Sequence, residues 1–120
     1  MQATARGSQF LVARDPGAGA EVEFEGEGVE LIGCLIEAGG RLEVRLDDQP
    51  PVVAESYLFA RDDMPLIYPE EALWFSGRIA PGRHVLRVCL LEDKHPQSKG
   101  RYAGLQAIVV FGSNTAAAGN

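Results

Sequence analysis

Apolar and polar residues alternate along much of this chain, and Gly or Pro interrupts the pattern at short intervals. In residues 20–25, Val22 and Phe24 share one face and glutamates occupy the other, which is the period-2 pattern of a half-buried strand. Residues 28–36 are mostly apolar instead. They predict a strand that is either buried on both faces or bulged at Gly33.

Two further pairs of strands follow from the same pattern. Residues 41–47 alternate cleanly and end at a tight reversal, after which residues 52–59 return as a partner, so this segment predicts a β-hairpin. Two long strands are expected at residues 83–91 and 102–111. We expect these two strands to be antiparallel, with the polar loop between them as an elaborated connection.

Residues 60–71 break the rhythm. Pro65 and Pro69 exclude a long helix, so we expect a long loop there, before a strand resumes at residues 72–79. A short first strand is expected at residues 9–13. Nowhere does a long segment show the 3.6-residue period of an amphipathic helix.

Seven or eight short strands with turn signals between them predict an all-β fold, an antiparallel sandwich or barrel. The length of 120 residues suits one domain. We expect a flexible N-terminus at residues 1–8, a β-sandwich domain at residues 9–112, and a disordered tail or linker at residues 113–120.

The net charge and the apolar runs of the chain disfavour some classes of partner. The net charge of −6 disfavours nucleic acid and anionic membranes. No run approaches the roughly 18 apolar residues of a membrane span, and residues 1–15 lack the apolar core of a secretory signal. The compartment stays open, because an excised module could be secreted or periplasmic. Cys34 and Cys89 lack the spacing of a metal site and are expected to be buried or partly buried free thiols.

Several segments together carry a family resemblance. They are GVELIG, the following Gly-Gly, LEVRLDDQP, and the long stretch from Leu73 to Gly112. Over roughly residues 20–112 the chain resembles the galactose-binding-like jelly-roll modules that accompany glycoside hydrolases and SGNH-type esterases. Residues 79–88 follow the family's L-x-P-G-x-H-x-L-x-V pattern closely, and residues 44–48 follow V-x-L-D-G with Asp48 in place of Gly.

The resemblance implies a jelly-roll β-sandwich of about eight strands that acts as a carbohydrate-binding-module-like accessory domain. Members of this family can hold a structural calcium ion, but no cluster of Asp and Asn offers itself as a ligand set, so we assign no cofactor and no metal. The Asp that the family usually carries near residues 106–107 is absent.

The candidate binding residues are aromatic or charged. Trp74 and Phe75 are adjacent, so a strand directs them to opposite faces; one belongs in the core, and the other can stack on a sugar ring. Tyr68, Arg61 and Asp62 lie in the irregular segment at residues 60–71. Lys94 and His95 lie in the basic loop from Lys94 to Arg101. Together the candidate ligand-binding residues are Trp74, Tyr68, Arg61, Asp62, Lys94 and His95.

Catalysis has little support in the sequence. No serine has the G-x-S-x-G context, and no phosphate or dinucleotide fingerprint occurs. His84 shares a face with Leu86 and Val88, which favours a packed, hydrogen-bonded residue at a sheet edge over an acid or base. We expect a non-catalytic module that binds a glycan and partners a hydrolase or esterase domain. The alternative is a structural spacer or oligomerisation sandwich without a ligand, with an exposed apolar patch that includes Val85, Cys89 and Leu91.

Overall fold

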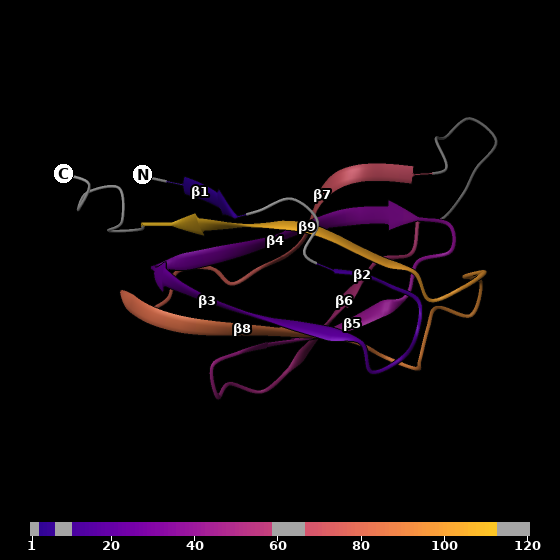
Figure 1. The fold of residues 1–120 in the computed structure, drawn as a ribbon, viewed down its shortest axis with the longest axis horizontal. Coiled ribbons are helices and arrows are strands. Elements are labelled where there is room, and N and C mark those ends of the chain that lie inside the picture. The colour runs from indigo at the N-terminus through magenta and orange to yellow at the C-terminus, as the bar shows by residue number, and fades with distance from the viewer. Residues whose placement is uncertain (1–2, 7–10, 59–66, 113–120) are drawn as a thin grey trace.

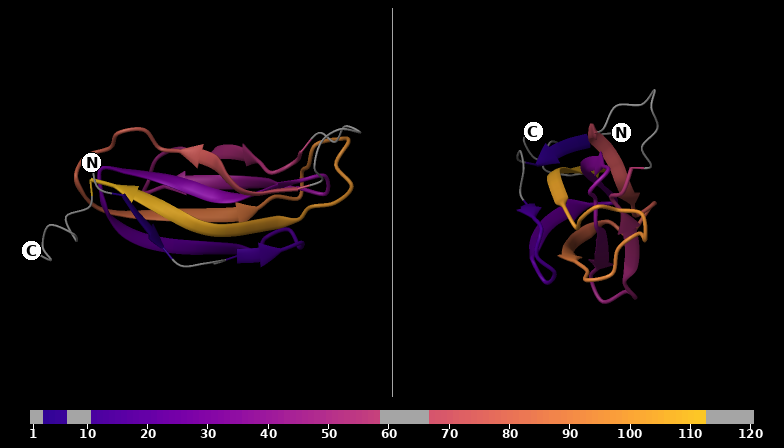
Figure 2. Two further views of the ribbon diagram at one scale, coloured as in Figure 1. Left: turned by 90° about the horizontal axis from the view of Figure 1, so that it is seen from above. Right: turned by 90° about the vertical axis from the view of Figure 1, so that its right-hand side faces the viewer.

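The structure is a computed structural model that describes residues 3–6, 11–58 and 67–112. These residues form nine strands, and none of them lies in a helix long and apolar enough to cross a membrane. The strands build two antiparallel sheets that pack face to face in an elongated sandwich (Figures 1 and 2). An all-β sandwich is what the alternation of apolar and polar residues predicts.

The chain crosses repeatedly between the two sheets, which we call sheet A and sheet B. The strands of sheet A are β1 (Ala3–Arg6), β2 (Leu11–Ala13), β4 (Gly28–Ile36), β7 (Ile67–Phe75) and β9 (Ala103–Phe111). The strands of sheet B are β3 (Gly19–Gly26), β5 (Arg41–Leu46), β6 (Val52–Glu55) and β8 (Gly82–Leu90). The order in sheet A is β1-β9-β4-β7, and the order in sheet B is β3-β8-β5-β6.

Strands β1 and β2 occupy one position in sheet A. The first pairs with residues 108–111 of β9 and the second with residues 103–105, and both lie on the side of β9 that faces away from β4. Nine strands therefore fill eight positions, which confirms the prediction of about eight strands. Strand β1 lies within residues 1–8, the segment that we expected to be flexible.

The core lies between the sheets and takes one face of each strand. In β5 the burial alternates strictly, and the Arg and Glu side chains face outward, because each strand exposes every second residue to the opposite sheet. The hairpin of β5 and β6 is confirmed, with Arg41 opposite Glu55 and Val44 opposite Val52. The largest fully buried apolar side chains are Leu31, Leu42, Leu86, Leu90, Leu105, Ile108, Val29 and Val44.

Strand β4 runs through the middle of sheet A, between β9 and β7. Its register with β9 shifts between Ile32 and Gly33, and its register with β7 shifts on either side of this point. A Cβ on Gly33 would lie 2.7 Å from the Gly104 carbonyl oxygen, so only glycine fits there. Of the two alternatives for this segment, the bulge at Gly33 is correct.

One strand pairing that we expected is wrong. Strands β8 and β9 lie in different sheets, and each pairs with other strands. Alternation shows that each strand has one face against the core, but it does not state which strands lie beside it in the same sheet, so it does not distinguish a paired strand from one in the facing sheet. The polar loop from Leu91 to Tyr102 crosses between the sheets instead of closing a hairpin (Figure 1).

Strand β7 begins at Ile67, within residues 60–71 where we expected a long loop; residues 60–66 lie outside the described residues. Strand β7 is the edge of sheet A, where a proline can sit without removing a hydrogen bond from the ladder. Pro69 also falls between the pairs Leu35–Tyr68 and Gly33–Glu71, where the register with β4 shifts. The edge position of β7 and its bulge together accommodate Pro69, although proline is not tolerated in a central strand.

Both cysteines are free thiols, as expected. Cys34 is buried in β4, and Cys89 is half-buried in β8. Burial raises the pKa of the Cys34 thiol above its ordinary value and outweighs the hydrogen bond from the backbone of Gly104. A neutral buried thiol of this kind behaves as a small apolar side chain.

Candidate functional site

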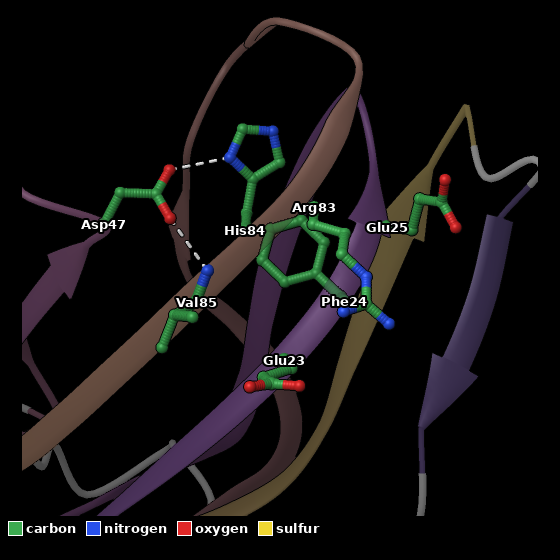
Figure 3. A pocket seen from close by; sticks show the side chains of 7 residues that line it. All are labelled: Glu23, Phe24, Glu25, Asp47, Arg83, His84 and Val85. Carbon is green, nitrogen blue, oxygen red and sulfur yellow. Dashed lines mark hydrogen bonds and ion pairs between the residues drawn. The ribbon is translucent and has the colours of Figure 1, made fainter.

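Two hollows lie at one end of the sandwich, on either side of the corner that joins β3 to β4. The first, which we call the histidine hollow, has a volume of about 360 Å³. Figure 3 shows its side chains, which come from β3, from the start of β8 and from the turn after β5. They are Glu23, Phe24, Glu25, Asp47, Arg83, His84 and Val85.

His84 is held at both ring nitrogens. Its Nδ1 lies 2.6 Å from the Asp47 carboxylate, and its Nε2 lies 2.7 Å from the Ala80 carbonyl oxygen. Both partners accept hydrogen bonds, so both ring nitrogens must donate, and only the protonated imidazolium has two N–H groups. The geometry therefore fits a charged His84 in an ion pair with Asp47.

The pKa values of the two groups agree with this assignment. Burial lowers the pKa of His84, but the hydrogen bonds to Asp47 and Ala80 outweigh it and raise the pKa above 6.5. Burial likewise raises the pKa of Asp47, but the hydrogen bonds from His84 and the Val85 amide outweigh it and hold the pKa below 3.8. Each partner therefore stabilises the charged form of the other.

Asp47 also fastens the turn after β5 to β8. Its second carboxylate oxygen accepts a hydrogen bond of 2.8 Å from the Val85 amide, and its own amide donates one of 2.8 Å to the Val85 carbonyl. The residue has a φ of +53°, a conformation that Asp tolerates better than most residues. Asp47 is thus the connection between two strands of sheet B, and His84 completes that connection.

The histidine hollow does not bring a nucleophile to this pair. The side chains that line it include no hydroxyl and no thiol. A general base needs an unoccupied ring nitrogen within reach of the proton that it takes, and the outer nitrogen of His84 is occupied by Ala80. The expectation that His84 is packed and hydrogen-bonded is correct. The expected place at a sheet edge is wrong, because β8 lies between β3 and β5 in sheet B.

The basic loop between β8 and β9 lies at the other end of the sandwich (Figure 1). Its cations are bound to the protein itself: Lys94 Nζ donates 2.7 Å to the Ser98 carbonyl, and Lys99 pairs with Glu37 at 3.1 Å. The His95 ring stacks on Tyr57, with ring centroids 4.4 Å apart. Lys94 and His95 stay candidates for ligand binding, and the structure shows that both already have intramolecular partners.

Ser98 anchors this loop from inside. Its side chain is buried, and its hydroxyl donates to the Gly39 carbonyl at 2.6 Å. A buried hydroxyl of this kind fixes a loop, because leaving it without a partner would cost about 1–3 kcal/mol. The loop is therefore an ordered end of the sandwich.

A bulge in β7 decides which member of the aromatic pair faces the core. Leu31 is opposite Trp74 and Ile32 is opposite Ala72, so Leu73 is the extra residue of the bulge. Leu73 and Trp74 both pack against the core cluster. Phe75 therefore points to the outer face of sheet A, where its side chain is 54% exposed.

The second hollow, which we call the aromatic hollow, lies beside Phe75 and has a volume of about 400 Å³. The Phe75 and Phe111 rings meet there edge to face, with centroids 5.6 Å apart. Phe111 pairs with Gly28 in β4, and Phe75 pairs with Glu30 two residues farther along. The complete lining is Glu27, Gly28, Phe75, Gly77, Arg78, Phe111 and Gly112.

The structure does not gather the candidate ligand-binding residues into one site. Trp74 packs against the core from β7, whereas Lys94 and His95 lie in the loop between β8 and β9. Tyr68 belongs to β7 opposite Leu35, but its side chain lies outside the described residues. Arg61 and Asp62 lie outside them as well, so all six residues stay predictions.

Sequence reasoning missed three residues of the aromatic hollow: Glu27, Arg78 and Phe111. A weak signal was present, since each is adjacent to a glycine that also lines the hollow. Only the sheet order makes this signal meaningful, because β7 and β9 flank β4. Among the described residues, no three His, Cys, Asp or Glu side chains gather closely enough to hold a metal ion.

Comparison with known proteins gives a likeness in structure alone. No protein-family model and no curated protein sequence matches the chain. One solved structure that it resembles is a two-domain esterase active on acetylated mannans, co-crystallised with mannopentaose, at a TM-score of 0.61 and 14% identity. That match covers 85% of this chain and 27% of the esterase.

A second solved structure is a family two carbohydrate esterase from Cellvibrio japonicus, at a TM-score of 0.53 and 15% identity. The match covers 92% of this chain and 31% of that one. The chain thus spans less than a third of either esterase. At such identities the likeness shows a shared β-sandwich fold, and fold by itself does not carry function.

Proposed function

We propose that this chain is a non-catalytic, carbohydrate-binding accessory module that partners an esterase domain. The observation that carries the proposal is the likeness to two carbohydrate esterases, in which a sandwich like this one makes up less than a third of the chain. The family resemblance of residues 79–88 supports the same assignment, to a galactose-binding-like jelly roll. On this proposal the bond-breaking residues belong to the partner domain.

The state of His84 supports the non-catalytic part of the proposal. Both ring nitrogens of His84 are hydrogen-bonded, to Asp47 and to Ala80. No hydroxyl or thiol side chain lines the histidine hollow. An Asp–His pair that serves catalysis normally presents one ring nitrogen to a nucleophile. Here the pair holds two strands of sheet B together.

Glycan binding fits the surface chemistry of the module. A sugar ring has an apolar face that stacks on an aromatic side chain and hydroxyls that need donors and acceptors at its rim. The described surface offers an exposed phenylalanine and charged side chains of both signs. Few contacts of this kind give weak binding, on the order of millimolar to micromolar dissociation constants.

Affinity electrophoresis tests the proposal directly. The whole chain is run in native gels cast with acetylated glucomannan, deacetylated glucomannan, xylan or galactan, beside a gel without polysaccharide. We expect retardation in at least one polysaccharide gel. Equal mobility in every gel, together with no shift in a titration with mannopentaose, would refute glycan binding.

The non-catalytic part has its own measurement. Hydrolysis of p-nitrophenyl acetate by the chain is compared with hydrolysis by His84→Gln at the same concentration. We expect both rates to equal the background of a protein without an active site. A clear turnover by the chain that His84→Gln abolishes would show that the hollow is catalytic.

A structural role is the second candidate, and one observation favours it. Val52 and Val53 on β6, the edge of sheet B, are 43% and 60% exposed, and such an edge can pair with another chain. The patch expected at Val85, Cys89 and Leu91 is half-buried at all three residues. Sedimentation velocity of the chain and of Val53→Lys separates the two roles, because only an edge-paired dimer dissociates on that change.

A further inference from the structure

We propose that the aromatic hollow is the sugar-binding site of this module, with Phe75 as the stacking platform and Glu27 and Arg78 as its polar rim. The inference rests on the proposed function. It takes Phe75 from the aromatic pair that the sequence singled out and adds Glu27, Arg78 and Phe111, which neither the sequence motifs nor the comparisons indicate. The ligand class is a neutral oligosaccharide built from pyranose rings.

The platform is built by the order of strands in sheet A. Phe111 on β9 and Phe75 on β7 lie on either side of β4, and β4 has Gly28 where it pairs with Phe111. With no side chain at Gly28, the two rings meet over the strand, edge to face, 5.6 Å between centroids. Phe111 thereby supports Phe75, whose side chain remains 54% exposed.

The polar rim offers both hydrogen-bond donors and hydrogen-bond acceptors. Arg78 is exposed beside the platform and donates through five N–H groups, while Glu27 only accepts. Among the described residues Arg78 forms no ion pair. One cation and one carboxylate favour a ligand without net charge, because a charged ligand would meet one of them unfavourably.

Three glycines keep the hollow open. Gly77 and Gly112 have φ values of +75° and +68°, which side chains rarely adopt, and Gly28 forms the floor between the rings. Gly77 lines the hollow, and a Cβ on it would meet no heavy atom within 4 Å, so a side chain there has open space beside the hollow. Glycines at such positions let a ligand approach the backbone closely.

A small ligand suits this surface better than a protein partner does. Among the described residues, the exposed large apolar side chains other than Phe75 are Val12, Val52 and Val53, which lie on β2 and β6. The apolar surface at Phe75 is therefore isolated, whereas a stable protein interface buries about 800 Å² on each side. The volume of about 400 Å³ falls within the range of small-molecule sites, roughly 300–1,000 Å³.

The test uses mannopentaose and xylopentaose as probes on the whole chain, labelled with nitrogen-15. We expect the largest amide shifts at Gly77, Arg78 and Gly112, and a loss of affinity of at least about tenfold in Phe75→Ala. Val53→Ala is the matched control, because it removes an equally exposed apolar side chain from the other sheet. It should bind as the unmodified chain does.

A second variant fills the hollow without removing the platform. Gly77→Asn adds a side chain where Asn tolerates a positive φ, and Gly17→Asn makes the same change at a remote positive-φ glycine that also has open space around it. We expect Gly77→Asn to lose binding and Gly17→Asn to keep it. Far-UV circular dichroism and thermal unfolding of both variants establish that they are folded.

The outcomes separate this inference from the proposed function. Sugar-induced shifts that gather at Lys94 and His95, or undiminished binding by Phe75→Ala, would leave a carbohydrate-binding module whose site is elsewhere. Shifts nowhere in the chain with any probe, and no retention on any polysaccharide, would overturn both. Amide shifts at the aromatic hollow that appear with an added esterase domain, and not with sugar, would overturn the inference and identify the hollow as a domain interface.

Discussion

The histidine hollow and the aromatic hollow flank the same corner of the sandwich, yet they differ in what their side chains do. In the first, His84 and Asp47 bind each other and the backbone. In the second, Phe75 is half exposed and Arg78 is exposed at the rim. Polar groups that are satisfied inside the protein hold the fold together, whereas groups directed at solvent remain available to a ligand. A conspicuous histidine is therefore a weaker sign of a site than an exposed ring in a hollow.

The largest effect on stability is expected at Trp74, the member of the aromatic pair that packs against the core. Trp74→Ala should destabilise the protein by about 3 kcal/mol, near the lower end for a truncated tryptophan because the side chain is only half-buried. Urea unfolding measures this difference. Trp74→Phe keeps most of the apolar contact and should cost about 1 kcal/mol. A cost below 1 kcal/mol for Trp74→Ala would mean that Trp74 does not support the core.

The architectural role of the histidine hollow is tested at Asp47. Asp47→Ala removes the hydrogen bonds to His84 and to the Val85 amide and places Ala at a φ of +53°. We expect a loss of about 2 kcal/mol, moderate because the side chain is 35% exposed.

Asp48→Ala, one residue away at an exposed position, is the matched control for that change. It should alter the free energy of unfolding by less than about 0.5 kcal/mol. If the two variants unfold at the same urea concentration, the carboxylate of Asp47 does not hold the turn to β8.

The features of the fold that depend on neighbouring residues can be predicted from the sequence. Those that depend on contacts between distant segments cannot. The hairpin of β5 and β6 follows from local alternation and a turn. The bulge in β7 does not, because strict alternation from a core-facing Leu73 would turn Phe75 toward the core and Trp74 outward, whereas Trp74 packs against the core and Phe75 is exposed. The extra residue lies at the edge of sheet A, where β7 has one partner, and no local pattern marks it.

The aromatic hollow was harder still to predict. Phe75 and Phe111 are far apart in the chain and meet only because β4 lies between their strands and has Gly28 beneath the rings. No local pattern states the order of strands in a sheet. The same limit explains why β8 and β9 were expected to pair with each other. The Asp47–His84 pair also depends on register, although the position of His84 at the end of an apolar face pointed to a packed residue.

Stability should depend on pH through the histidine hollow. The folded pKa of His84 is raised, so its contribution is complete below pH 6.5 and is lost as the pH rises through the folded value. The folded pKa of Asp47 is lowered, so its contribution is present above 3.8 and is lost as the pH falls through the folded value. The pair therefore stabilises the fold most at pH values between these two ordinary pKa values.

Comparing the chain with His84→Gln isolates this effect from other titrating groups. The difference in free energy of unfolding between the two proteins should be larger at about pH 5.5 than at about pH 8.5. Urea titrations at both values measure it. A difference that is the same at both pH values would show that folding does not raise the pKa of His84.

A smaller effect on stability is expected at Phe75 than at Trp74 or Asp47. Phe75→Ala should destabilise the fold by less than about 1 kcal/mol, because the ring is 54% exposed and loses mainly its contact with Phe111. Thermal or urea unfolding beside Trp74→Ala measures the contrast between neighbouring aromatic residues. A cost as large as that of Trp74→Ala would make Phe75 a structural residue like His84. A small cost together with lost sugar binding would mean that this ring is kept exposed for a ligand.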